Sequence, residues 1–182
     1  MKRPFRRPVV RAVLALGAAG LAVALYLFQP WRLFTTVEVN EAPPVAVTAP
    51  ASSASSAPGA SARPATWPKT LATGRFVSHE HDTAGTAEVL ELADGGRVLR
   101  IEDLDTSDGP DLRVWLSDQP VKEGRDGWFN LDDGEHLELG ELKGNKGDAN
   151  YAIPAGADLD DLRTVTIWCR RFSVSFGAAA LT

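Results

Sequence analysis

The sequence predicts an all-β fold, an antiparallel β-sandwich or barrel of about eight strands, preceded by one transmembrane helix and a disordered Ala/Pro/Ser linker. Three observations predict this organisation. An uncharged apolar stretch lies near the N-terminus, a segment with few aromatic residues follows it, and the remaining chain alternates short β-prone runs with Gly-, Pro- and Asp-rich turns. We therefore expect a leader and anchor over 1–32, a linker over 33–70 and an outer domain over 71–182.

The first element is the expected anchor. Residues 12–28 carry no charge, and a membrane-spanning helix needs about 20 apolar residues, with a lower limit near 17. Val9 and Val10 extend the stretch, so residues 9–28 are expected to contact the membrane. Five of the six Lys and Arg residues in 1–32 precede it, which places the N-terminus in the cytoplasm and the outer domain outside the cell membrane.

A cleaved signal peptide is the alternative to this anchor. Such a peptide has a shorter apolar region and a small-x-small cleavage site. Here the bulky run Leu25–Trp31 follows the apolar stretch, and no cysteine is available for lipid attachment. The sequence therefore favours an uncleaved signal anchor in a single-pass membrane protein.

The second element is the linker. Ala, Pro and Ser fill 19 of the 25 positions in 42–66. Without apolar periodicity, this composition buries too little surface to offset the chain entropy lost on folding. We expect a disordered stalk that lets the outer domain reach partners in the envelope; a passive linker is the alternative.

The third element is the outer domain, whose strands are separated by turns such as Asp94-Gly95-Gly96. This spacing is typical of a sandwich or barrel. The apolar face changes parity between Cys169 and Phe172, so we expect a bulge or bend at 170–171. The expected strands are Arg75–Ser78, Thr86–Leu92, Val98–Leu104, Leu112–Ser117, His136–Leu142, Asn150–Ile153, Thr164–Cys169 and Phe172–Phe176.

Composition excludes several classes of function. Residues 69–182 contain 22 acidic and 12 basic side chains, and such a domain repels phosphates, so we expect no nucleic-acid partner. Because Cys169 is the single cysteine, an intrachain disulfide and a Cys-rich zinc module are both excluded. The chain has no Gly-x-Ser-x-Gly, His-Glu-x-x-His or phosphate-loop motif, so hydrolase or transferase activity is not indicated.

A set of short motifs also occurs in order along the outer domain: Gly74-Arg75-Phe76, Asp108-Gly109-Pro110-Asp111-Leu112, Val114-Trp115-Leu116, Leu142-Lys143-Gly144-Asn145-Lys146-Gly147, Tyr151-Ala152-Ile153-Pro154, Val165-Thr166-Ile167-Trp168-Cys169, and Phe172, Val174, Phe176, Gly177 and Ala180. Together they resemble the DM-thirteen domain, the family catalogued as "electron transfer DM", in an N-terminally anchored, bacterial-type form. The resemblance implies a β-rich extracellular domain whose cysteine, here Cys169 beside Trp168, is a redox thiol or ligates a prosthetic group such as haem.

Cys169 is the first candidate site. Neighbouring cations lower the pKa of a thiol, and Arg170 and Arg171 follow it, although at most one of two consecutive strand residues faces the sulfur. In the alternative, Cys169 is a small core residue on the face of Val165 and Ile167.

Two further clusters are candidate ligand sites, each with a solvated turn as the alternative. His79 and His81 would share one side of a strand and suit copper, zinc or haem iron. Clustered carboxylates suit Ca²⁺. The carboxylates in question are Asp103, Asp105, Asp108 and Asp111. A haem, another redox centre, Ca²⁺ or no cofactor at all is compatible with these residues.

The sequence thus favours a membrane-tethered extracytoplasmic domain that takes part in electron transfer or thiol redox chemistry through Cys169, with an unknown envelope protein or redox partner. The alternative is a non-catalytic surface-binding or structural module in which Cys169 is a core residue. Of the tryptophans, Trp128 is expected at the surface, whereas Trp115 and Trp168 are expected to pack in the core.

Overall fold

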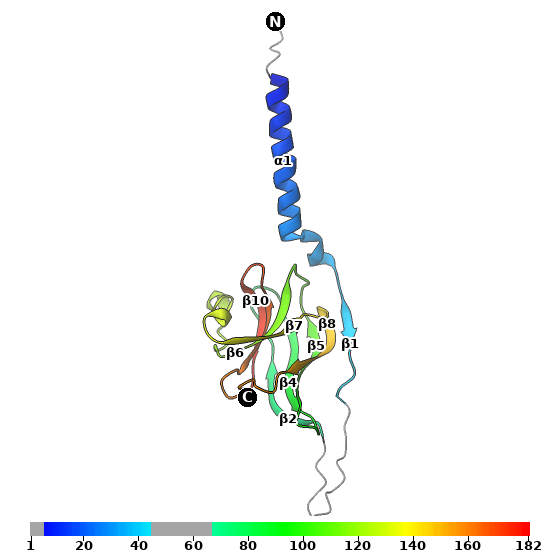
Figure 1. The fold of residues 1–182 in the computed structure, drawn as a ribbon, viewed down its shortest axis with the longest axis vertical. Helices are drawn as coiled ribbons and strands as arrows, with labels where there is room; N and C mark the ends of the chain where they lie inside the picture. Colours follow the sequence, from blue (N-terminus) through cyan, green and yellow to red (C-terminus); the bar gives the residue numbers. More distant parts are fainter. Residues whose placement is uncertain (1–5, 45–66) are drawn as a thin grey trace, which may run out of the picture.

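The structure is a computed structural model that describes residues 6–44 and 67–182 (Figure 1). Most of the expected stalk, residues 45–66, lies outside the described residues. In chain order the elements are α1 (Arg6–Phe28), the 3-10 helix η1 (Pro30–Phe34), β1 (Glu38–Asn40), β2 (Lys69–Arg75), β3 (Val77–Ser78), β4 (Ala84–Glu91), β5 (Arg97–Asp105), β6 (Leu112–Ser117), the 3-10 helices η2 (Gly124–Gly127) and η3 (Asn130–Asp132), β7 (His136–Glu141), β8 (Lys146–Ile153), β9 (Thr164–Cys169) and β10 (Val174–Ala180).

The helix α1 projects away from the sandwich and contacts it at its C-terminal end (Figure 1). The stretch Pro8–Arg32 is long and apolar enough to cross a membrane, and its apolar residues are not buried inside the protein. The 23 residues of α1 span about 35 Å at 1.5 Å per residue, which exceeds the hydrocarbon core of a bilayer. The helix ends at Phe28, where Gln29 adopts a left-handed φ of 42° before Pro30.

Two five-stranded sheets pack face to face, which confirms the predicted all-β sandwich. The first sheet has the order β1-β8-β5-β4-β2 and the second the order β3-β10-β9-β6-β7. Strand pairs are antiparallel except β1–β8, which is parallel. The strands β1 and β2 were not expected from the sequence, because β1 falls in the proposed linker and β2 contains few apolar residues.

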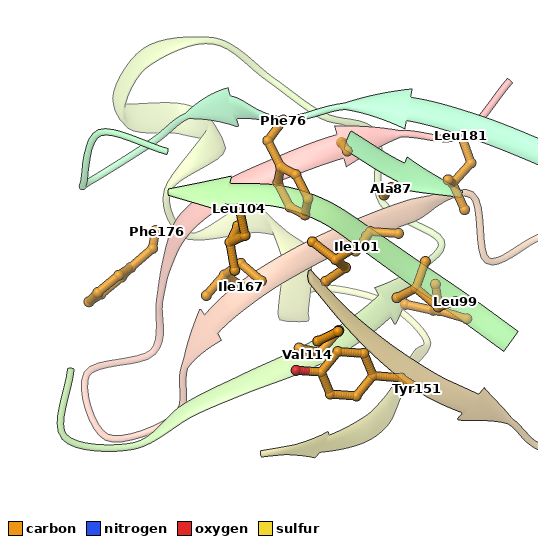
Figure 2. Packing of buried hydrophobic residues seen from close by; sticks show 14 of the residues in the cluster. Phe76, Ala87, Leu99, Ile101, Leu104, Val114, Tyr151, Ile167, Phe176 and Leu181 are labelled. Carbon is orange, nitrogen blue, oxygen red and sulfur yellow. The ribbon is translucent and has the colours of Figure 1, made fainter. Parts of the chain in front are cut away.

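The core lies between the sheets. Leu99 and Ile101 on β5 and Tyr151 on β8 meet Val114 on β6 and Ile167 on β9 (Figure 2). Each side chain is at most 5% exposed. Fully burying a side chain of this size contributes roughly 1.5–3 kcal/mol, so this cluster supplies much of the stability of the domain.

The central strands of the second sheet, β6, β9 and β10, are buried on both faces. A smaller cluster of Trp115, Leu131, Trp168 and Ala178 packs on its outer side. Every residue of β9 is therefore buried. A strand covered on both faces has no solvent side, so consecutive residues such as Trp168 and Cys169 enter two different clusters.

The expected irregularity after β9 is confirmed, and it is a reversal of the chain. Residues 170–173 form a turn, and Cys169 pairs with Val174 at the start of the antiparallel strand β10. Ser173 has a left-handed φ of 48° within this turn. The apolar residues change from odd-numbered to even-numbered positions because Phe172 belongs to the turn and Val174 to a new strand.

The residues after α1 dock on the domain. Although residues 38–40 were placed in the linker, they form β1 and pair with residues 146–148 of β8. The Lys143 ammonium donates to Glu41 at 2.7 Å, and the Asn150 N–H donates to the same carboxylate at 2.7 Å. These hydrogen bonds hold the pKa of Glu41 below its usual value. Residues 38–41 are ordered because they pair with the free edge of β8. The composition of the segment alone does not predict this pairing.

Candidate functional site

Cys169 is sealed in the core between the sheets. Its side chain is 0% exposed, and its strand neighbours across β9 are Leu112 on β6 and Val174 on β10. Burial raises the pKa of the thiol, and the nearby backbone N–H groups of Phe172 and Arg171 offset only part of that rise. The thiol is therefore protonated at neutral pH, and the reactive thiolate is disfavoured.

The two arginines after Cys169 bind other groups. Arg170 donates to the Asp111 carboxylate at 3.1 Å, and Arg171 donates to the Leu27 carbonyl at the end of α1 at 3.0 Å. Cys169 also lines neither of the two cavities that flank the β9–β10 turn. This arrangement favours the alternative in which Cys169 is a core residue.

The two histidines of the expected chelate lie on opposite faces of β10. His79 shares a 2.8 Å hydrogen bond with the Ser175 hydroxyl, whereas the ring of His81 packs on Phe176 with centroids 3.9 Å apart. Consecutive strand residues point to opposite faces, so the two imidazoles diverge. The expectation that they share one side fails because β3 ends at Ser78 and the chain bends after it.

His79 belongs to a buried polar network. It is 7% exposed, and the Ser175 hydroxyl that it contacts also shares a 2.8 Å hydrogen bond with Thr166. Burial lowers the pKa of His79 more than the nearby Lys122 carbonyl raises it. Its Nε2 atom has no hydrogen-bond partner within the described part of the chain. The imidazole is therefore held neutral inside the fold.

The four aspartates of the calcium hypothesis do not converge. Among residues 6–44 and 67–182, no group of three or more His, Cys, Asp or Glu side chains is placed to hold a metal ion. Asp105 pairs with Lys146, Asp108 with Arg32, and Asp111 with Arg113 and Arg170. The Asp103 N–H donates to Asp148 at 2.9 Å. The geometry disagrees with calcium binding, because three of the four carboxylates are neutralised by different cations.

Asp111 pairs with two arginines, Arg113 at 2.8 Å and Arg170 at 3.1 Å. Burial acts to raise its pKa, but the hydrogen bonds and charges of Arg113 and Arg170 outweigh burial, and the pKa of Asp111 lies below its usual value. The same contact raises the pKa of Arg113. This pairing fixes the start of β6 against the turn after β9.

An apolar cavity, called here the helix-end cavity, lies between the end of α1 and the domain. It has a volume of about 530 Å³. Phe28 at the end of α1 stacks on Phe172 of the β9–β10 turn, with ring centroids 5.5 Å apart. Trp128 also lines the cavity; it was expected at the surface, but it is half-buried and packs against the main core. Glu80 and His81, which pair with each other, are among the polar residues of the lining.

A row of three rings crosses the outer side of the second sheet. This aromatic row consists of His136 on β7, Trp115 on β6 and Trp168 on β9. The His136 and Trp115 centroids are 4.2 Å apart with an interplanar angle of 14°, and the Trp115 and Trp168 centroids are 5.0 Å apart with an angle of 23°. Sequence reasoning placed both tryptophans in the core but missed the row, which depends on the register of three strands.

The Trp115 ring nitrogen has a charged partner. It donates a hydrogen bond of 3.1 Å to the Glu138 carboxylate. Arg113 approaches the same carboxylate at 3.4 Å and Arg170 at 4.0 Å. A row of aromatic rings with a fixed proton acceptor at its centre is the second candidate site of the domain.

These features define a class of protein, a two-sheet β-sandwich module carried by one N-terminal apolar helix. Within that class the chain belongs to the Electron transfer DM13 family, whose model matches residues 75–181. The match runs from the end of β2 past the end of β10, so it covers nearly the whole sandwich. No curated protein and no solved structure matches the chain.

The residues around Cys169 do not fit a thiolate-bound prosthetic group. A thiolate ligand needs an open position beside its sulfur, and Cys169 is fully buried between paired strands. Neither His79 nor His81 joins it in a group that would hold a metal within the described residues. The haem implied by the family resemblance therefore has no site at this sulfur in the observed fold.

Proposed function

We propose that this protein is a membrane-tethered, extracytoplasmic electron-transfer domain. The observation that carries the proposal is the family match over residues 75–181, in a chain that begins with a helix long enough to cross a bilayer. Electron transfer is the activity that the family description attaches to the domain.

Contacts between the helix end and the sandwich support an uncleaved anchor. Arg171 donates to the carbonyls of Tyr26 and Leu27 at 3.2 and 3.0 Å, and Phe28 stacks on Phe172. A cleaved signal peptide has no need of a binding surface on the mature domain. The basic leader of 1–32 supports a cytoplasmic N-terminus and an outer location for the sandwich.

The proposed electron transfer does not use a free thiolate at Cys169. A thiol needs exposure and a lowered pKa to react, and Cys169 has neither. Cys169 acts in the fold as a small apolar residue, beside Val165 and Ile167 on the same face of β9. The redox partner is an envelope protein with a basic surface, because the outer domain carries an excess of acidic side chains.

Binding of an apolar ligand is the second candidate function. The helix-end cavity favours it, because aromatic side chains line a volume of about 530 Å³ next to the membrane end of the domain. Ligand sites of this size are commonly apolar with a few polar groups, and Glu80 and His81 would supply those groups here.

The full chain purified from membranes of its native host tests both candidates. Carbonate washing should leave the protein in the membrane, and protease added outside intact cells should digest the sandwich. Voltammetry of the purified chain should give a reversible redox wave. A colourless protein that shows no redox wave but quenches Trp128 fluorescence when an apolar dye is added would replace electron transfer with ligand binding.

A further inference from the structure

The aromatic row links the surface to the interior of the second sheet. Its outer member His136 is exposed, whereas Trp115 is 5% and Trp168 is 1% exposed. Trp115 pairs with Glu138 on β7 and with Thr166 on β9, so His136 and Trp168 lie diagonally on either side of it. Diagonal neighbours on one face of a sheet are within reach of aromatic side chains, which explains the two short centroid distances.

Trp115 has the two features that make an indole a reversible electron donor. Its ring overlaps that of Trp168, so positive charge on either ring spreads over both. Its N–H points at the Glu138 carboxylate at 3.1 Å, so the proton that an oxidised indole releases has an acceptor in place. Arg113 and Arg170 hold that carboxylate in position.

We propose that Trp115 is a one-electron redox site of this domain, with Glu138 as its proton acceptor. This inference rests on the proposed electron-transfer function and replaces Cys169 with Trp115 as the reacting group. An external one-electron oxidant, such as a high-potential metal complex, takes one electron from the indole. The N–H bond of Trp115 breaks, an O–H bond forms on Glu138, and a neutral indolyl radical remains. Re-reduction by one electron returns the proton from Glu138 to the ring nitrogen.

The other rings of the row have supporting roles. The side chain of Trp168 shares the charge from the buried side of the stack. His136 covers the solvent side of Trp115 and marks the surface at which an oxidant approaches. Trp128 lies outside the row, since it lines the helix-end cavity and packs only obliquely on Phe129, with centroids 6.3 Å apart.

The experiment uses the full chain in detergent micelles, oxidised by flash-quench with a ruthenium polypyridyl complex. Phe replaces the three tryptophans outside the row, Trp31, Trp67 and Trp128, so that the radical signal comes from the row alone. Transient absorption and electron paramagnetic resonance then distinguish the neutral radical from the cation radical. We expect the neutral indolyl radical in this background.

Two variants test the assignment. Glu138→Gln keeps the shape of the side chain but removes the proton acceptor, so the cation radical should persist and lose its proton roughly tenfold more slowly, in line with the loss of a charge-assisted hydrogen bond. Trp115→Phe should abolish most of the radical yield. Circular dichroism checks that each variant is folded, and the Glu138 variant provides the test if Trp115→Phe is not.

The outcomes separate this inference from the proposed function. An unchanged radical and deprotonation rate in Glu138→Gln overturns the role of Glu138, and an undiminished yield in folded Trp115→Phe overturns the role of Trp115. If Trp115→Phe loses the radical but still gives the redox wave of the native chain, Trp115 is not the working centre. If the radical forms on Trp115 but the native chain gives no redox wave, the electron-transfer function itself is wrong.

Discussion

Replacing Cys169 decides between a core residue and a reacting thiol. The side chain is 0% exposed and faces the cluster that contains Leu112 and Val174. Cys169→Ala removes one buried sulfur atom, which costs about 1 kcal/mol, comparable to losing a buried methyl group. Cys169→Ser places a hydroxyl in the same apolar site and costs roughly 1–3 kcal/mol unless it finds a hydrogen-bond partner.

These free energies convert into measurable melting temperatures. For a domain of this size 1 kcal/mol shifts the Tm by roughly 4 °C, so the serine variant should melt some 4–12 °C below wild type and below the alanine variant. Thermal unfolding followed by circular dichroism gives both values. In parallel, a maleimide should label Cys169 only after the protein is denatured, because burial hides the sulfur and raises its pKa.

Rapid labelling of the native chain, together with a wild-type Tm for Cys169→Ser, would refute the reasoning. The sulfur would then be open to solvent in a populated state, and thiol chemistry at Cys169 would again be the stronger hypothesis.

Three further predictions concern stability. Arg100 is 3% exposed and forms ion pairs with Glu102 at 2.6 Å and Asp148 at 2.8 Å. Arg100→Ala should therefore lower the free energy of unfolding, measured by urea titration, by about 2–4 kcal/mol. Arg113→Ala should lower it less, because Arg113 is more exposed. Because the folded pKa of His79 is depressed, the stability that its neutral form contributes is present above pH 6.5 and is lost as the pH falls below that value. In His79→Gln the Tm should therefore fall less steeply below pH 6.5 than in the wild type, and an equally steep fall would contradict this. Burial raises the pKa of Tyr151 to about 12, so stability should decline as the pH rises from 10 towards 12, and a Tyr151→Phe variant that declines equally would remove Tyr151 as the cause.

The sequence predicts strands where the pattern is dense and bounded by turns. The expected bounds of Leu112–Ser117 and Thr164–Cys169 agree with β6 and β9, because β-branched and aromatic residues fill them. Alternation also places Cys169 with Val165 and Ile167 on the face towards the main core. What alternation does not reveal is that the opposite face, with Trp168, is covered as well.

The remaining differences come from tertiary contacts. A strand of three residues such as β1 is specified by the free edge of β8 and not by its own composition. His79 and His81 diverge because a bend follows β3, and the guanidinium of Arg170 turns to Asp111, which is distant in sequence. The aromatic row requires the pairing of β7, β6 and β9, which no single segment encodes.

The place where β1 joins the first sheet changes how the Ala/Pro/Ser-rich segment is understood. The strands β1 and β2 occupy opposite edges of one sheet, and the chain leaves β1 and enters β2 at the end of the sandwich remote from α1 (Figure 1). Residues 41–68 thus connect two points of a single folded unit. If α1 spans the bilayer as proposed, the height of the sandwich above the lipid headgroups is set by Gln29–Val37. Halving this connection, with Glu41 and its hydrogen bonds kept, would change the loop-closure free energy by only about 0.6 kcal/mol and would leave that height unaltered.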